Sequence, residues 1–243
     1  MAKGGQGTVD DSSQLTYNDS PSLGWLAAGV AIGTAGALLI IPHWLPGMIS
    51  SVTGDEAKGF WYISRIAGWE AYFFLWASLV LGLAITGRVG RAWWNPSLLF
   101  ALHELTGLLG TVLALTHALI LIGDRFIGYN PVQILVPFSQ PAYRPFWVGL
   151  GQLALYLLLP TTLTFYLRRK LGYQMWRRLH YGTFAVYYLG AMHALGAGSD
   201  SLAAASLWFY GITSAVAYGL VLIRLWDQSR PTRRALRPNA KET

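Results

Sequence analysis

Long apolar runs separated by short polar segments dominate this sequence. Each run is close to the ~20 residues that an α-helix needs to cross the hydrocarbon core of a bilayer. The runs are continuously apolar and lack the alternating pattern of barrel strands, so they favour helices. We therefore expect an all-α integral membrane protein, built as a bundle of six transmembrane helices. The six predicted spans are residues 23–41, 61–86, 98–122, 146–167, 176–197 and 202–223.

The predicted spans divide the chain into three parts. Residues 1–21 are polar and lack the basic and apolar stretches of a signal peptide, so we expect a disordered cytoplasmic tail. Residues 22–226 form the predicted six-helix domain. Residues 227–243 are basic and too few for a nucleotide-binding domain, so we expect a second cytoplasmic tail. Within the domain, the Pro-rich connection 123–145 predicts an ordered, non-helical flap.

The distribution of positive charge predicts the orientation of the helices. The chain has 18 Lys and Arg residues and a formal net charge of +7. All but four of these basic residues lie in the two tails, after the last span, or in the loops after the second and fourth spans. Because basic loops are retained in the cytoplasm, we expect a multi-pass protein with both termini cytoplasmic. The charge follows no groove-reading or stacking pattern, so we expect membrane lipid and no nucleic acid as a partner.

The composition restricts the available chemistry. Apolar residues make up 53% of the chain and charged residues only 12%, whereas a soluble domain carries about 25% charged residues. The chain has no Cys, which excludes disulfides, Cys-ligated zinc, iron–sulfur clusters and covalently attached haem. Any redox cofactor must therefore be bound by His or without covalent attachment.

Four of the five His residues fall inside predicted spans, where ionisable residues are candidates for function. His103 and His117 lie in the third span, and His180 and His193 lie in the fifth. Both spans enter the membrane from the same side, so His103 should lie at the depth of His180, and His117 at the depth of His193. Two imidazoles facing each other supply the axial ligands of a b-type haem. We expect two haem b groups, one above the other.

Two other interpretations of these His residues stay open. Each could be a packing residue hydrogen-bonded to a neighbouring helix. A metal site with three or four ligands is a further alternative, although the two His residues of each span stand about 20 Å apart along the helix.

The two His residues are 14 residues apart in the third span and 13 apart in the fifth, and helix geometry gives these spacings different directions. A spacing of 14 residues returns to within ~40° of the same helix face, whereas 13 residues miss it by ~140°. The fifth span would therefore have to bend, and its glycines permit bending. Glycines in the third and fifth spans would also let a porphyrin approach the backbone, although Gly is common in packed membrane helices. These glycines are Gly107, Gly110, Gly182 and Gly190.

The segments HELTGLLGTVLALTH and HYGTFAVYYLGAMH resemble the ferric reductase-like transmembrane domain. NADPH oxidases, ferric reductases and the membrane subunit of a bacterial methionine sulfoxide reductase system share this domain. The resemblance covers roughly the second to sixth spans, and it implies that the two His pairs ligate two haems. The segment WYISRIAGWEAYFFLW resembles the second helix of the family, which implies that Arg65 lies beside the outer haem. From the residues alone, Arg65 could pair with a haem propionate, pair with Glu70, or reach the lipid headgroups.

The resemblance also bears on partners. NADPH oxidases and eukaryotic ferric reductases carry a C-terminal flavin and nicotinamide domain, which we do not expect here because the chain ends shortly after the last span. It is more similar to stand-alone bacterial members, which implies the bacterial inner (plasma) membrane. Electrons would then come from a separate cytoplasmic flavoprotein or from quinol, with a flavin or quinone at the partner interface. They would pass to an extracytoplasmic acceptor through this oxidoreductase subunit, a cytochrome b.

Two other functions remain possible on the sequence. The chain could be a quinol-linked anchor subunit of a larger dehydrogenase, with Glu70 or Glu104 at a quinone pocket. It could also be a non-catalytic membrane subunit of a respiratory or photosynthetic complex.

Further candidate residues lie at the two membrane surfaces. His43 follows the first span, where it could be an interfacial side chain, help to bind an acceptor or substitute as a haem ligand. Arg88, Arg91, Arg177 and Arg178 could neutralise haem propionates or dock an acidic donor, although orientation alone explains them.

Overall fold

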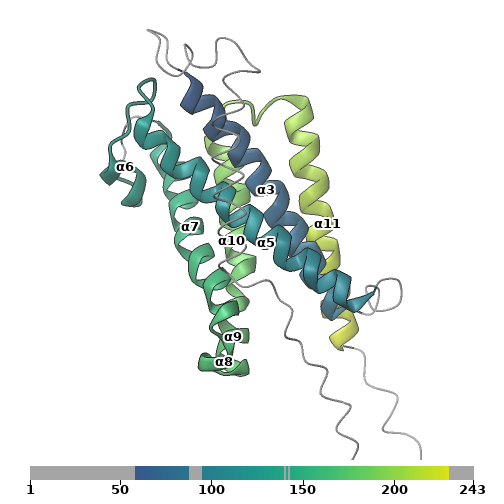
Figure 1. Ribbon diagram of the computed structural model, residues 1–243. Helices are drawn as coiled ribbons and strands as arrows, with labels where there is room; N and C mark the ends of the chain where they lie inside the picture. Colours follow the sequence, from purple (N-terminus) through teal and green to yellow (C-terminus); the bar gives the residue numbers. More distant parts are fainter. Residues whose placement is uncertain (1–57, 88–94, 140, 142, 230–243) are drawn as a thin grey trace, which may run out of the picture. The chain divides into compact units, whose positions relative to one another are not determined.

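The computed structural model describes residues 58–87, 95–139, 141 and 143–229 (Figure 1). The predicted N-terminal tail, the predicted span at 23–41, His43, Arg88, Arg91 and most of the predicted C-terminal tail lie outside the described residues. The other five predicted spans are helical, and the described residues contain no strand.

Four helices are long and apolar enough to cross a membrane within the described part of the chain. They are α3 (Gly59–Thr86), α5 (Pro96–Leu119), α7 (Pro145–Tyr166) and α11 (Ala204–Ser229). A short 3₁₀ turn, η2 (Ile120–Gly123), continues α5. These helices make the chain a multi-pass membrane protein.

The fifth predicted span is not one continuous helix. After the short helix α8 (Arg168–Leu171), the chain forms α9 (Tyr173–His180) and then α10 (Gly182–Ala197). Tyr181 separates α9 from α10. Its carbonyl accepts a hydrogen bond from the N–H of Phe184, three residues further on (3.2 Å), which makes a tighter turn than an α-helix. The 16 residues of α10 are fewer than the ~20 that span hydrocarbon, so this segment depends on α9 for its length.

Local sequence signals explain where the helices begin. The Asn95 side chain caps α5 by accepting a hydrogen bond from the Ser97 N–H (2.9 Å), and Pro96 occupies the first helical position. Pro145 occupies the first position of α7, where a Pro loses no helical hydrogen bond.

The described helices pack mainly as two antiparallel pairs. The α3 helix lies along α5, and α10 lies along α7. Contacts of α3 with both α10 and α11 join these elements. The space between the two pairs is where side chains from α5 meet side chains from α9 and α10.

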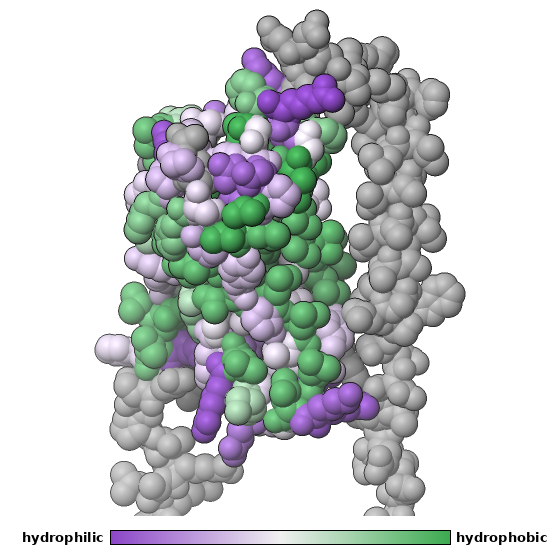
Figure 2. Space-filling view, turned by 90° about the vertical axis from the view of Figure 1, so that its left-hand side faces the viewer, coloured by the Kyte–Doolittle hydropathy of each residue, from purple (hydrophilic) through white to green (hydrophobic). Residues whose placement is uncertain are grey.

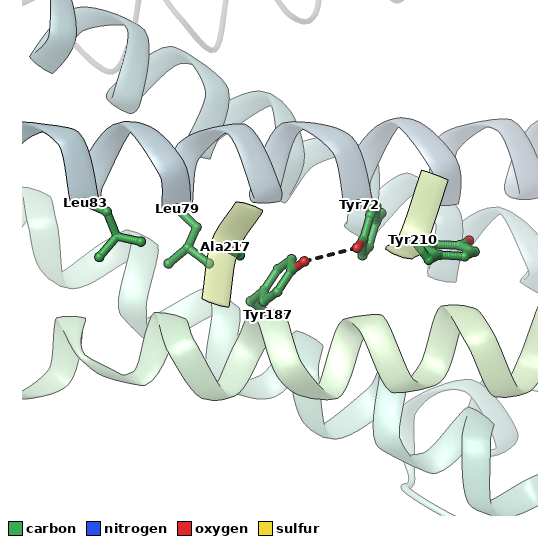
Figure 3. Close-up of a cluster of buried hydrophobic side chains, with 6 residues drawn as sticks. All are labelled: Tyr72, Leu79, Leu83, Tyr187, Tyr210 and Ala217. Atoms are coloured by element: carbon green, nitrogen blue, oxygen red, sulfur yellow. Dashed lines mark hydrogen bonds between the residues drawn. The ribbon is translucent and has the colours of Figure 1, made fainter. Parts of the chain in front are cut away.

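A buried cluster forms where α3, α10 and α11 meet (Figure 3). The Tyr72 hydroxyl bonds to the Tyr187 hydroxyl (3.1 Å) and to Thr213 Oγ1 (2.8 Å), which satisfies a phenol that burial removes from water. Large apolar side chains cover the outside, and Trp208 is 72% exposed. Figure 2 shows apolar residues over much of the middle of the described helices, with the most hydrophilic residues toward the two ends. This is the surface that a lipid bilayer requires.

The connection 123–145 corrects one expectation. We expected it to be non-helical, but it contains the short helix α6 (Pro131–Leu135). Asn130 and Gln133 form a reciprocal capping box, and Pro131 begins the helix, so local start signals outweigh the Pro content of the segment. The Gln152 side chain of α7 holds this segment by donating to two of its carbonyls, Gln133 O (2.8 Å) and Ile134 O (2.7 Å).

Candidate functional site

The four His residues of α5, α9 and α10 lie in two facing pairs. The ring centroids of His103 and His180 are 5.9 Å apart, and the ring planes cross at 81°. The centroids of His117 and His193 are also 5.9 Å apart, with an angle of 70°. Relative depth alone predicted these two pairs, and the structure has both.

The two His residues of the fifth predicted span lie in different helices. His180 is the last residue of α9, whereas His193 lies in α10. Because Tyr181 interrupts the regular helix between them, the ideal repeat of 3.6 residues per turn does not relate their directions.

Hydrogen bonds set the tautomer of three of these rings. Nδ1 of His117 bonds to Ser64 O (2.7 Å), and Nδ1 of His103 bonds to Ser78 O (2.8 Å). Nδ1 of His193 bonds to Trp147 O (2.9 Å). A backbone carbonyl only accepts hydrogen bonds, so Nδ1 carries the proton in each ring. Nε2 then keeps the lone pair that binds a metal.

His180 is held differently. Its Nδ1 is buried without a hydrogen-bond partner, as is Nε1 of Trp176. The two rings stack, with centroids 5.3 Å apart and planes 29° from parallel. Stacking on Trp176, rather than a hydrogen bond, therefore orients the fourth ring.

The separation within each pair fits an iron with one imidazole on either side. An iron bound at the ~2.0 Å typical of metal–imidazole bonds would hold the two ring centroids about 6 Å apart. Both observed separations are 5.9 Å. No group of three or more His, Asp or Glu side chains that could hold a metal comes together among the described residues. The paired donors thus suit a haem, which brings its own equatorial ligands, better than a metal ion held by side chains alone.

Glycines lie against the three hydrogen-bonded rings. A Cβ atom at Gly68 would be 2.8 Å from Nδ1 of His117, and one at Gly82 would be 3.1 Å from Cε1 of His103. A Cβ atom at Gly151 would be 2.5 Å from Nδ1 of His193. Sequence reasoning missed these glycines, and the signal that could have found them is the spacing of Gly68 and Gly82, which equals the 14-residue spacing of His103 and His117.

The glycines singled out from the sequence have other neighbours. A Cβ atom at Gly110 would meet Leu75 at 2.8 Å, and one at Gly107 would meet Ser78 Oγ at 3.2 Å. These two residues therefore let α5 approach α3. At Gly182 a Cβ atom would meet Thr161 of α7, and at Gly190 it would meet nothing within 4 Å.

Arg65 forms an ion pair with Asp200, which lies between α10 and α11. Its guanidinium also lies over the Trp61 ring, 4.6 Å from the centroid. Asp200 is thus the protein carboxylate beside Arg65, rather than Glu70. Sequence reasoning missed Asp200 because it is far from Arg65 along the chain and lies outside every predicted span.

Three hydrogen bonds involve Glu104 and Arg177, at the opposite end of the helices. Glu104, next to His103, accepts a hydrogen bond from the Tyr166 hydroxyl (3.0 Å), which links α5 to α7. Arg177 donates to the hydroxyls of Tyr173 (2.6 Å) and Tyr181 (3.2 Å).

Comparison with known families gives a match. The sequence profile of the family described as ferric reductase like transmembrane component matches residues 67–191. The match covers just over half of the chain and includes most of α3 and the whole of α5, α7 and α9. It ends within α10 at Ala191, two residues before His193. No curated protein and no solved structure matches the chain. By this match, the chain belongs to the ferric reductase-like transmembrane component family.

Proposed function

We propose that this protein is a dihaem cytochrome b that carries electrons across a membrane. The observation that carries the proposal is the presence of two His pairs with the same 5.9 Å centroid separation at two depths. Membership of the family indicates transmembrane electron transfer in general, and domains of this family generally bind haem. The proposed axial ligands are His103 with His180, and His117 with His193.

Each part of the chain has a distinct task in this proposal. Haem, when bound, supplies a one-electron couple. The α5, α9 and α10 helices would hold the haems through His residues at two levels, which are about 20 Å apart along α5. The Nδ1 hydrogen bonds orient three of the four rings. The apolar helix surfaces exclude water between the two levels.

The charge distribution suggests the direction of transfer. His180 closes α9, whose last turn also contains Arg177 and Arg178. Because basic segments stay in the cytoplasm, we place the His103/His180 pair on the cytoplasmic side and the His117/His193 pair on the outer side. A separate donor with an acidic surface, such as a flavoprotein, would be attracted to the basic end. The acceptor would then be extracytoplasmic, as expected for a bacterial inner membrane protein.

Arg65 is the proposed partner of an outer haem propionate. It directly follows Ser64, which contacts His117, so it lies at the level of the outer pair. Its side chain is 30% exposed, and its present partner Asp200 is 50% exposed. A propionate would meet the same guanidinium through charge-assisted hydrogen bonds.

A quinol is a second candidate donor, because Glu104 and Tyr166 form a hydrogen-bonded pair beside His103. A carboxylate in this position can take up a proton released when a quinol is oxidised. Sensitivity of haem reduction to quinone-site inhibitors distinguishes this donor from a flavoprotein.

The direct test is the reduced minus oxidised absorption spectrum of the purified protein, with haem per chain measured as the pyridine haemochrome. We expect two b-type haems per chain. His117→Ala and His103→Ala should each lose one haem or both, because an iron that loses one axial ligand is held more weakly. His43→Ala tests the fifth His and should keep both haems, because the two His pairs supply all four proposed ligands. A protein expressed with ample haem that binds none would overturn the proposal and favour a non-catalytic membrane subunit.

A further inference from the structure

The two His residues of α5 have the same hydrogen-bonding arrangement with α3. Ser64 Oγ donates to the backbone carbonyl of His117 (2.8 Å), and Ser78 Oγ donates to that of His103 (3.2 Å). In the reverse direction, Nδ1 of each ring bonds to the carbonyl of the same Ser. Each Oγ is also 3.1 Å from Nδ1 of its His. Each Ser therefore holds the main chain and the ring of one His together.

A glycine completes each arrangement four residues further along α3. Gly68 follows Ser64, Gly82 follows Ser78, and each lies against the ring that its Ser holds. In a helix, a carbonyl already accepts a bond from the N–H four residues on, and its second lone pair remains available. A side chain at that fourth residue would occupy the space beside this lone pair. The Ser-x-x-x-Gly pattern thus opens a carbonyl of α3 to an imidazole of α5.

The equal spacing of the two Ser and the two His residues indicates that both Ser residues have the same role. The two Ser residues are 14 residues apart in α3, as are the two His residues in α5. Both Ser side chains are buried, Ser64 at 2% and Ser78 at 9% exposure. On α7, Trp147 and Gly151 offer His193 a carbonyl and a glycine at the same interval, without the hydroxyl. The hydroxyl contribution is therefore specific to the α5 ligands.

We propose that Ser64 and Ser78 are positioning residues that orient His117 and His103 as haem ligands and increase electron donation from Nε2. The inference rests on the proposed function. A hydrogen bond from Nδ1–H makes the other ring nitrogen a stronger donor, and loss of such a partner typically weakens metal binding 10–100-fold. Because Ser→Ala leaves the carbonyl in place, we expect the lower end of this range, about 10-fold. A weaker donor also stabilises ferric iron less, so the midpoint potential should rise.

The test uses the full-length haem-loaded protein in detergent. Ser64→Ala and Ser78→Ala are compared by potentiometric titration and by the rate of haem transfer to excess apomyoglobin. We expect each variant to raise the potential and speed the haem loss of one component only, a different one in each variant. Ser206→Ala, at a buried serine of α11, is the control and should change neither.

Two further variants and two outcomes keep the inference testable. If an Ala variant does not fold, Ser→Cys at the same position keeps a weaker hydrogen-bond donor and acceptor, and it should shift the potential in the same direction by less. Gly68→Ala, which places a methyl group against His117, should loosen the component that Ser64→Ala affects. Two bound haems with Ser variants indistinguishable from the control would overturn this inference alone. A wild-type protein without haem would overturn both it and the proposed function.

Discussion

The four paired His residues differ in what holds each ring. Three have a backbone carbonyl on Nδ1 and a glycine beside the ring, whereas His180 has neither and stacks on Trp176. The His residues themselves were predictable, because ionisable side chains inside apolar runs are rare. Their Ser and Gly neighbours were not, because small residues are common wherever membrane helices pack.

The exception at His180 leads to a prediction about Trp176. Trp176→Ala removes the stacking contact and leaves the buried imidazole without an orienting partner. An aromatic contact of this kind contributes about 0.5–1.5 kcal/mol, so haem affinity at one site should fall roughly 2- to 10-fold. The haem transfer rate checks this result. Trp208→Ala, at a lipid-exposed Trp of α11, should leave both rates unchanged, and equal effects of the two substitutions would contradict the assignment.

The length of the apolar runs predicted which segments form long helices, but it did not predict where a helix is interrupted. The predicted spans at 61–86, 98–122 and 146–167 agree closely with α3, α5 and α7. The predicted span at 176–197 missed the break at Tyr181, because hydropathy does not detect a single tightened turn. The same criterion missed α6, whose Asn130 cap and Pro131 are local signals inside a Pro-rich segment.

Two side chains of α7 hold the segment that contains α6: the Tyr156 hydroxyl donates to Leu135 O, and Gln152 makes three hydrogen bonds. Gln152 donates to Gln133 O and Ile134 O, and its Oε1 accepts from the Phe138 N–H (3.2 Å). Gln152→Ala should therefore increase hydrogen–deuterium exchange and protease cleavage within residues 131–139. Because each lost bond is worth about 1 kcal/mol, exchange there should rise at least several-fold. Gln152→Glu, which keeps only the acceptor, should give a smaller change, and an unchanged exchange rate in Gln152→Ala would show that other contacts hold the segment.

At the scale of the whole molecule, the described helices place both His pairs between two helix pairs. The α3/α5 pair provides one imidazole at each level, and α7 with α9 and α10 provides the other. Contacts of α3 with α10 and α11 hold the two sides at the cluster around Tyr72 (Figure 3). Each candidate haem site thus exists only when distant segments of the chain pack together.

The absence of Cys allows a clean test of orientation. Single substitutions can be labelled with a membrane-impermeant maleimide without background. We expect Arg169→Cys to react only from the cytoplasmic side and Arg125→Cys only from the outer side, because basic segments are retained inside. The ratio of labelling in intact cells to labelling in inverted vesicles measures the result. The opposite pattern would place the His103/His180 pair at the outer surface.

The sequence by itself determined that this is a helical membrane protein with His residues at two levels of its apolar segments. Hydrocarbon requires every backbone polar group to be satisfied within the segment, so apolar length alone specifies a helix. The His spacing specified depth, because the rise per residue is constant along a helix. Only the tertiary structure decided which groups meet Nδ1 of His103 and His117, and that Asp200 meets Arg65. Those contacts depend on how each helix is rotated about its axis and on which helix lies beside it, and apolar runs leave both free.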